Sequence, residues 1–159
     1  MTIAIFDIDG TLADTGHRMH HIKPESGKKK NWGAFFANAK HDNVFEHVLM
    51  LNQLLFQCGA ETYLITGRPD NLREDTLKWL KDKGVCFHRL YMRPSSVTKP
   101  DYEVKKDIFN EHLASRKDEI LFVFEDRIPV AQMWRELGLP VLLCGDEWIP
   151  NKKDCTWIE

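Results

Sequence analysis

The stretch TIAIFDIDGTLADTGHR, residues 2–18, begins as a continuous apolar run and then turns abruptly to acids and a glycine. A short apolar run that ends in a turn signal is typical of a strand buried on both faces of a sheet. Asp7 and Asp9 lie two residues apart, so on an extended segment their side chains point the same way. The sequence therefore predicts a buried strand that brings two carboxylates together at its carboxyl end.

Two carboxylates at one point repel each other, and the arrangement calls for a positive partner. A magnesium ion fits this need, because it takes hard oxygen ligands, keeps some waters and shares its other positions with a substrate phosphate. Gly10 permits a tight turn after the acids, and Thr11 offers backbone and hydroxyl donors. An ordinary turn that caps a helix would explain one aspartate and the glycine, but not the second acid.

The rest of the chain alternates short apolar runs with longer amphipathic segments, a pattern that predicts an α/β fold of Rossmann type, a parallel sheet flanked by helices. Ligands in such sheets bind beyond the carboxyl ends of the strands, so the polar endings TGR (66–68) and EDR (125–127) belong with the first acid pair. Further strands are expected at 62–66, 89–92, 120–125 and 140–144, and helices near 44–55, 69–83, 101–113 and 130–137.

Composition fits one globular domain over residues 1–159, with 43% hydrophobic and 29% charged residues. No apolar stretch approaches the roughly 18 residues of a membrane span, and no basic flank precedes the first apolar run, so we expect a cytoplasmic protein without membrane contact. The cysteines are far apart and lack metal-binding spacing, which favours reduced thiols; they are Cys58, Cys86, Cys144 and Cys155.

Residues 17–42 interrupt the alternation and are expected to form a small cap insertion after the first strand, with a short helix from Trp32 to Ala39. The segment is basic within a chain of net charge -2, which suits an anionic substrate, although a solvated surface turn also explains its lysines. Its aromatic residues could stack a nucleobase, yet packing within the insertion is the simpler interpretation; they are Trp32, Phe35 and Phe36.

Four motifs in this order resemble the haloacid dehalogenase (HAD) superfamily, and within it the 3'-phosphatase domain of bacteriophage-type polynucleotide kinase/phosphatases. After DIDGT come Arg18, ITGR (65–68), KPDYEVKKDIF (99–109) and FEDRIPVAQMWRELG (124–138). No G-x-x-x-x-G-K-[ST] motif occurs, so a 5'-kinase activity is not predicted for this chain. The acid pair is Glu125-Asp126 where the family usually has two aspartates, which leaves open which of the two contacts the metal.

The resemblance implies that Asp7 attacks phosphorus to form an aspartyl-phosphate and that Asp9 acts as acid and then base. Lys105 would neutralise charge beside Asp7, with Lys99 as the rival candidate. The implied catalytic residues are Asp7, Asp9, Thr66 and Lys105; the substrate-binding residues are Arg18, Arg68, Thr11 and Gly67; Asp101 supports the lysine; and the Mg²⁺ ligands are Asp7, Asp9, Asp126 and Glu125.

The resemblance implies a Mg²⁺-dependent phosphomonoesterase that removes terminal 3'-phosphates from nucleic acid. A phosphatase of free nucleotides or other small phosphorylated metabolites would use the same site chemistry, and a silent binding module is the alternative of a different class. Three neighbouring histidines could suggest zinc, but without a fourth ligand at useful spacing they favour cap or substrate contacts; they are His17, His20 and His21. The sequence leaves the oligomeric state open.

Overall fold

The computed structural model describes residues 1–23 and 28–145 and shows a five-stranded parallel sheet. The strand order β5-β4-β1-β6-β7 places the first strand of the chain in the middle, where both of its faces are covered. Each strand falls where the apolar runs predict it, which confirms the parallel α/β architecture. The strands are β1 (Ile3–Phe6), β4 (Glu61–Pro69), β5 (Arg89–Arg93), β6 (Ile120–Glu125) and β7 (Val141–Leu143).

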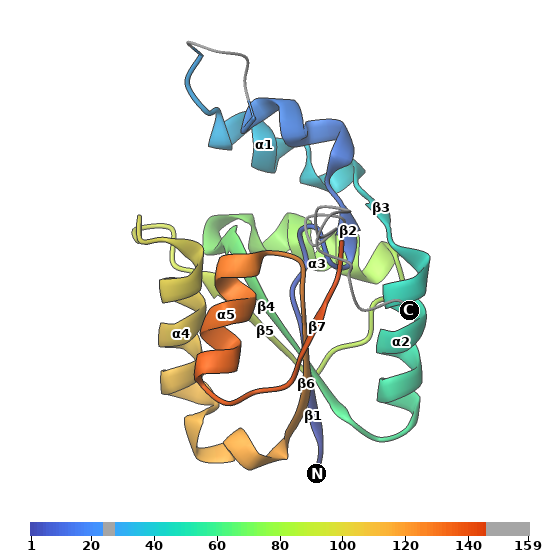
Figure 1. Cartoon of the computed structure of the whole chain (residues 1–159). Coiled ribbons are helices and arrows are strands. Elements are labelled where there is room, and N and C mark those ends of the chain that lie inside the picture. The colour runs from blue at the N-terminus through green and yellow to red at the C-terminus, as the bar shows by residue number, and fades with distance from the viewer. Residues whose placement is uncertain (24–27, 146–159) are drawn as a thin grey trace, which may run out of the picture.

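Helices cover both faces of the sheet, with α4 and α5 on one side and α2 and α3 on the other (Figure 1). Alternate residues of β1 supply the two cores: Ile3 and Ile5 pack toward α4 and α5, whereas Ala4 and Phe6 pack toward α2 and α3. This double burial explains why β1 is apolar throughout. The helices are α2 (Glu46–Gln57), α3 (Arg73–Asp82), α4 (Asp101–His112) and α5 (Ile128–Glu136).

A cap segment, residues 16–42, rises beyond the carboxyl ends of the strands, as Figure 1 shows in blue for its described parts. Its two ends are joined by a two-residue antiparallel pair, β2 (Ala13–Asp14) with β3 (Asn43–Val44). This pair escapes sequence analysis because two residues carry no periodic signal. Between the strands lie the 3-10 helix η1 (Gly16–His21), the helix α1 (Trp32–Ala37) and the 3-10 helix η2 (Ala39–His41).

Element boundaries differ from the expected ones by a few residues. The helix expected from Trp32 to Ala39 is α-helical only to Ala37, where Asn38 separates it from η2. The helix expected from residue 69 begins instead as a 3-10 turn, η3 (Asp70–Leu72), because Pro69 still belongs to strand β4. A second 3-10 segment, η4 (Ala114–Glu119), leads from α4 into β6.

Three cysteines, Cys58, Cys86 and Cys144, are free thiols, in agreement with their wide spacing. Cys155 lies outside the described residues. Among the helices that the structure describes, none combines the length and the apolar character needed to cross a membrane.

An ion pair at the start of β4 predicts how stability depends on pH. Arg116 donates to Glu61, with Nη2 2.7 Å from Oε1, and Tyr63 donates to the same carboxylate. The hydrogen bonds from Arg116 have the largest effect and the one from Tyr63 the next, and together they lower the pKa of Glu61 from 4.5 to about 2. A depressed carboxylate pKa contributes stability that is present above the unfolded pKa and is lost as the pH falls through the folded one. We therefore expect the Tm of the wild type to fall more steeply between pH 4.5 and pH 2 than that of Glu61→Gln. Parallel Tm profiles in calorimetry would contradict this assignment.

Candidate active site

Three carboxylates meet at the carboxyl edge of the sheet, which is where the parallel topology predicts a site. Asp7 directly follows β1, Glu125 ends β6, and Asp126 is the next residue. One oxygen from each of the three lies within 4.8 Å of the others, and Asp7 and Glu125 are buried. Because β1 and β6 are hydrogen-bonded neighbours in parallel register, the sheet itself fixes this convergence.

A buried lysine joins this carboxylate cluster. Lys105, on α4, places its Nζ 2.8 Å from Asp7 Oδ1 and 2.8 Å from Glu125 Oε2, while Asp101 Oδ2 lies farther away at 3.5 Å. Lys99, the other candidate, pairs with Asp107 on the surface. The structure therefore brings Lys105, and not Lys99, to the predicted nucleophile.

Burial and charge set the protonation of the cluster. Burial raises the pKa of Asp7 well above its usual value; Lys105 opposes this shift, and the charge of Glu125 adds to it. Burial also raises the pKa of Asp126, and the charge of Glu125 adds to this effect, so that the pKa reaches about 7. Burial acts to lower the pKa of Lys105, but Asp101, Asp7 and Glu125 outweigh it and raise that pKa well above the usual value.

The donor set fits a divalent cation. Three carboxylates face a single ammonium group, so the ionised cluster carries two surplus negative charges. Asp126 Oδ1 is buried and accepts no hydrogen bond from the described residues, which leaves a hard oxygen of a cluster residue without a partner. Hard oxygens with excess negative charge are the ligands that Mg²⁺ prefers. Asp7, Glu125 and Asp126 are therefore the residues that would hold the ion.

Two glycines allow the acids to approach the backbone closely. Gly10 has φ +89°, and a Cβ there would lie 2.1 Å from Asp126 Oδ2. A Cβ on Gly67 would lie 2.4 Å from Asp101 Oδ1. The glycines of DIDGT and ITGR are thus required by side chains that come from elsewhere in the sequence, and Gly67 acts by making room for Asp101.

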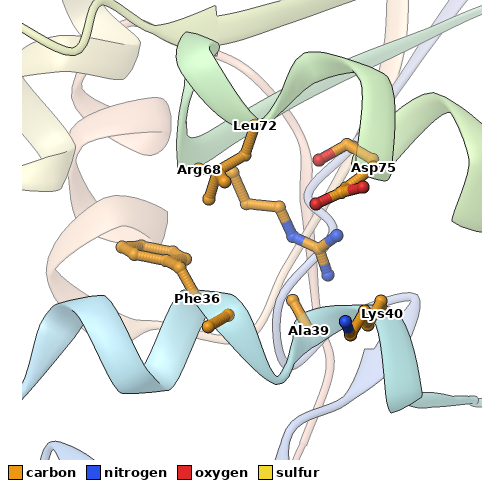
Figure 2. Close-up of a pocket in the computed structure, with 8 residues that line it drawn as sticks. Phe36, Ala39, Lys40, Arg68, Leu72 and Asp75 are labelled. Atoms are coloured by element: carbon orange, nitrogen blue, oxygen red, sulfur yellow. The ribbon is translucent and has the colours of Figure 1, made fainter.

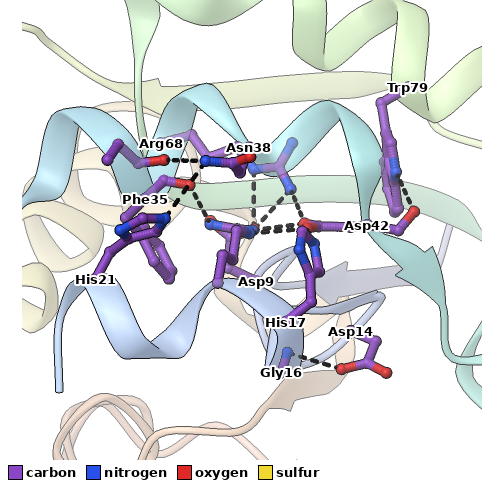
Figure 3. A network of polar contacts seen from close by, with 12 residues as sticks. Asp9, Asp14, Gly16, His17, His21, Phe35, Asn38, Asp42, Arg68 and Trp79 are labelled. Atoms are coloured by element: carbon purple, nitrogen blue, oxygen red, sulfur yellow. Dashed lines mark hydrogen bonds and ion pairs between the residues drawn. The ribbon is translucent and has the colours of Figure 1, made fainter. Parts of the chain in front are cut away.

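A second polar network surrounds Asp9, the other acid of the opening motif (Figure 3). Arg18 Nη2 and Arg68 Nη2 each lie 2.6 Å from Asp9 Oδ1, and both guanidinium groups are almost completely buried. Burial acts to raise the pKa of Asp9, but Arg68 and Arg18 outweigh it and lower the pKa below its usual value. Asp9 is therefore ionised in this conformation.

The same two arginines bind Asp42, a residue that sequence analysis missed. Asp42 is fully buried; its Oδ1 accepts from Arg18 Nε at 2.8 Å, and its Oδ2 accepts from Arg68 Nη2 at 3.2 Å. Its backbone carbonyl accepts from Trp79 on α3 at 3.0 Å. Asp42 thus joins the cap segment to the sheet through β4. Its only sequence signal was an acid at the end of a basic segment, which is weak.

The metal ligands and arginines predicted from sequence need correction in this light. Among the described residues, the carboxylates close enough to share an ion do not include the side chain of Asp9, because Arg18 and Arg68 bind it instead. Both arginines, expected to grip substrate, are occupied by Asp9 and Asp42 in this conformation.

The two threonines differ in what they can offer a ligand. Thr66 is buried within β4, and its Oγ1 accepts from the backbone N–H of Arg68 at 3.2 Å. Thr11 is also buried; its backbone N–H donates to Ile8 at 3.3 Å, and its hydroxyl finds no partner among the described residues. The backbone donor expected of Thr11 is therefore already used within the turn.

The cap histidines make local contacts. His17 Nε2 lies 2.8 Å from Asp42 Oδ1, at the outer side of the arginine network. The rings of His20 and His21 are 3.9 Å apart, and His21 approaches the side chain of Asn38 at 3.5 Å.

Comparisons with known proteins show the family of this chain. A family model described as the polynucleotide kinase PNKP phosphatase domain matches residues 1–147. A protein of Autographa californica nuclear polyhedrosis virus, named as a bifunctional polynucleotide kinase/RNA ligase, is 28% identical over 144 residues, which are 88% of this chain and 19% of the relative. The chain therefore spans only about a fifth of the length of that relative.

Solved structures show the same fold. A chain of the Pnkp1/Rnl/Hen1 RNA repair complex is 27% identical and superposes with a TM-score of 0.71, over 91% of this chain and 43% of that one. A HAD-hydrolase, YfnB of Bacillus subtilis, solved with magnesium bound, is 13% identical with a TM-score of 0.66, over 94% and 89% of the two chains, and shares the fold. With its family matched over nearly its whole length, the chain belongs to the polynucleotide kinase phosphatase domains of the HAD superfamily and is a phosphatase.

Proposed function

We propose that this phosphatase is a Mg²⁺-dependent phosphomonoesterase that removes terminal 3'-phosphates from nucleic acid through an aspartyl-phosphate on Asp7. The observation that carries the proposal is the position of Asp7 within the carboxylate cluster, with Lys105 2.8 Å from its Oδ1. That arrangement combines a nucleophile, a fixed cation and oxygen ligands for a metal at a single point.

In the first step, Asp7 attacks phosphorus, a bond forms between its carboxylate oxygen and phosphorus, and the ester bond to the leaving oxygen breaks. Lys105 orients the attacking carboxylate and stabilises charge on the transferring phosphoryl group, while Asp101 and Glu125 hold the ammonium in place. Magnesium, when bound by the cluster, supplies further electrostatic stabilisation of that charge. Thr66, on the strand β4 next to β1, donates a hydrogen bond from its hydroxyl to a phosphoryl oxygen.

Asp9 acts as the general acid and then as the general base. It gives a proton to the departing alkoxide and later takes one from the water that attacks phosphorus and breaks the bond to Asp7. The ionised state imposed by Arg18 and Arg68 suits the second of these tasks. A substrate phosphate competes with Asp9 for hydrogen bonds from the same two guanidinium groups. When the arginines bind the phosphate in place of Asp9, the Asp9 carboxylate is free to take up a proton from solvent.

The substrate class rests on the family and on charge. One relative is named as a polynucleotide kinase/RNA ligase, and another belongs to an RNA repair complex. The described cap residues, which lie beyond the carboxyl ends of the strands, include several cations. One enzyme preparation should be assayed on 3'-phosphorylated oligonucleotides, 5'-phosphorylated oligonucleotides and mononucleotides. We expect the 3'-phosphorylated strand to have the highest kcat/KM. Faster turnover of mononucleotides would instead establish a phosphatase of small metabolites.

Salt dependence provides a separate test of the polyanionic substrate. Bound nucleic acid displaces counterions, so affinity falls steeply as salt rises, whereas a small monoester releases few ions. We expect added KCl to lower kcat/KM on a 3'-phosphorylated oligonucleotide much more than on p-nitrophenyl phosphate. Equal sensitivity of the two substrates would mean that the cap cations do not contact the strand.

Replacing Gly10 by Ala should abolish metal binding, because the new Cβ would lie 2.1 Å from Asp126 Oδ2 and push that carboxylate out of the cluster. Gly59→Ala is a matched control: Gly59 has a similar φ of +84°, yet a Cβ there meets nothing within 4 Å. Both variants therefore share the backbone strain of about 1 kcal/mol. We expect titration calorimetry with MgCl₂ to show binding for Gly59→Ala and not for Gly10→Ala; equal affinities would exclude Asp126 as a ligand.

A further inference from the structure

Helix α1 of the cap segment presents two aromatic rings on one side. Trp32 and Phe36 are one helical turn apart, with ring centroids 5.9 Å apart and planes 25° from parallel. Phe35, in contrast, is buried beneath the guanidinium of Arg18, 4.0 Å from its ring centroid, and belongs to the packing of the cap. Trp32 is 48% exposed and Phe36 is half-buried, so the pair forms an aromatic surface that the cap covers only in part.

This surface continues toward the active site. Phe36 from α1, Leu72 from η3 and Arg68 from β4 together line a narrow slot, as Figure 2 shows. The same Arg68 places Nη2 2.6 Å from Asp9 Oδ1. The slot itself has a volume of about 10 Å³, enough for one water molecule and far too small for a nucleobase. A base therefore does not enter this slot, and next to it the outer aromatic surface is the place where a base can stack.

Cations flank the aromatic pair. Lys30 Nζ lies 5.9 Å from the centroid of the Trp32 ring, and Lys40 lines the same slot as Phe36. Alternating cations and exposed aromatic rings are the features of surfaces that bind single-stranded nucleic acid, where the cations follow the phosphates and the rings stack on the bases.

We propose that Trp32 and Phe36 stack on the bases of the last nucleotides of a single strand while its terminal phosphate enters the site beside Arg68. This inference rests on the proposed function and specifies the substrate: a single-stranded 3' end recognised by its base faces and not by base sequence. The stack also selects against duplex ends, whose paired bases already stack on each other. Exposed aromatic residues alone are common on protein surfaces, and it is the continuity with Arg68 that gives this pair its assignment.

A six-residue helix is too short to be stable alone, so removing its aromatic residues also risks the cap itself. The test therefore uses Trp32→Leu and Phe36→Leu, which retain apolar bulk and lose the flat ring. Phe56→Leu is the matched control, because Phe56 is a half-exposed aromatic residue that packs on His88 near the C-terminal end of α2, the end of that helix away from the cap.

Two substrates with the same phosphates separate the effect of base stacking from that of charge. One is a 3'-phosphorylated oligonucleotide, and the other is the same strand with its last two nucleosides abasic. For the wild type we expect kcat/KM to favour the complete strand by about 5- to 100-fold. In Trp32→Leu and Phe36→Leu this ratio should fall toward one, and in Phe56→Leu it should stay at the wild-type value.

The outcomes that contradict the proposal are distinct from those that contradict the function. If the wild type removes phosphate from both strands at equal rates, the stacking assignment is wrong and the nucleic-acid function stands. The same conclusion follows if the leucine variants lose activity on both strands in the same proportion. If the wild type hydrolyses p-nitrophenyl phosphate but neither strand, the nucleic-acid function is wrong, and the stacking assignment is wrong with it.

Discussion

Asp7→Asn should lower turnover of p-nitrophenyl phosphate by a factor of about 10⁴ or more, because the amide cannot act as the nucleophile. The substitution should abolish activity without unfolding the protein. Burial raises the pKa of Asp7, so its ionised form opposes folding at neutral pH, and the neutral amide removes that cost. We expect the Tm of the metal-free variant to equal or exceed that of the wild type.

The control for this variant is Asp107→Asn, which changes an exposed aspartate that pairs with Lys99 on the outer side of α4. It should retain wild-type kcat/KM. Substantial Mg²⁺-dependent turnover by Asp7→Asn, measured on protein shown by mass spectrometry to be free of deamidation, would exclude Asp7 as the nucleophile.

Asp42→Asn should cost both stability and activity. Asp42 and Asp9 together balance the charges of Arg18 and Arg68, so the amide leaves one buried guanidinium without a counterion. Breaking a buried ion pair in this way costs about 3–5 kcal/mol, which is on the order of a 10 °C loss in Tm for a domain of this size. Displacing the arginines from Asp9 should also lower kcat/KM by about 100-fold.

Asp14→Asn is the matched control, because Asp14 lies on β2 beside the cap, and its side chain accepts a hydrogen bond from the backbone N–H of Gly16 at 2.9 Å without contributing to the arginine network. Thermal unfolding and steady-state assays, the latter well below the Tm of each variant, separate the two effects. A folded Asp42→Asn protein with unchanged kcat/KM would show that Asp42 merely fastens the cap and does not position the arginines.

The sequence predicted the sheet well for a physical reason. A strand covered on both faces must be apolar at every position, so β1 and β6 stand out as uninterrupted runs, and the residue that follows each lies at the carboxyl edge. Asp7, Glu125 and Asp126 were therefore predictable as a group from strand ends alone. Choosing Lys105 over Lys99 required the family motif, since both lie near the same helix start.

Other parts of the site were not predictable because they depend on contacts between distant residues. Asp42 is 24 residues from Arg18 and 26 from Arg68, and no local pattern marks an acid that will be buried between two arginines. The role of Asp9 was hard to predict for the same reason. Strand alternation places Asp9 near the edge of the sheet, but it does not reveal that Arg18 and Arg68 bind the Asp9 carboxylate in place of a metal.

The central claim is that phosphate is transferred to Asp7, and the most direct test is to trap it there. In Asp9→Asn the first step can proceed with p-nitrophenyl phosphate, whose leaving group needs no proton, but the second step lacks its base. After mixing with substrate and MgCl₂, quenching and borohydride reduction, mass spectrometry should find Asp7 converted to homoserine in nearly every molecule. Steady release of phosphate with an unmodified Asp7 would contradict the account.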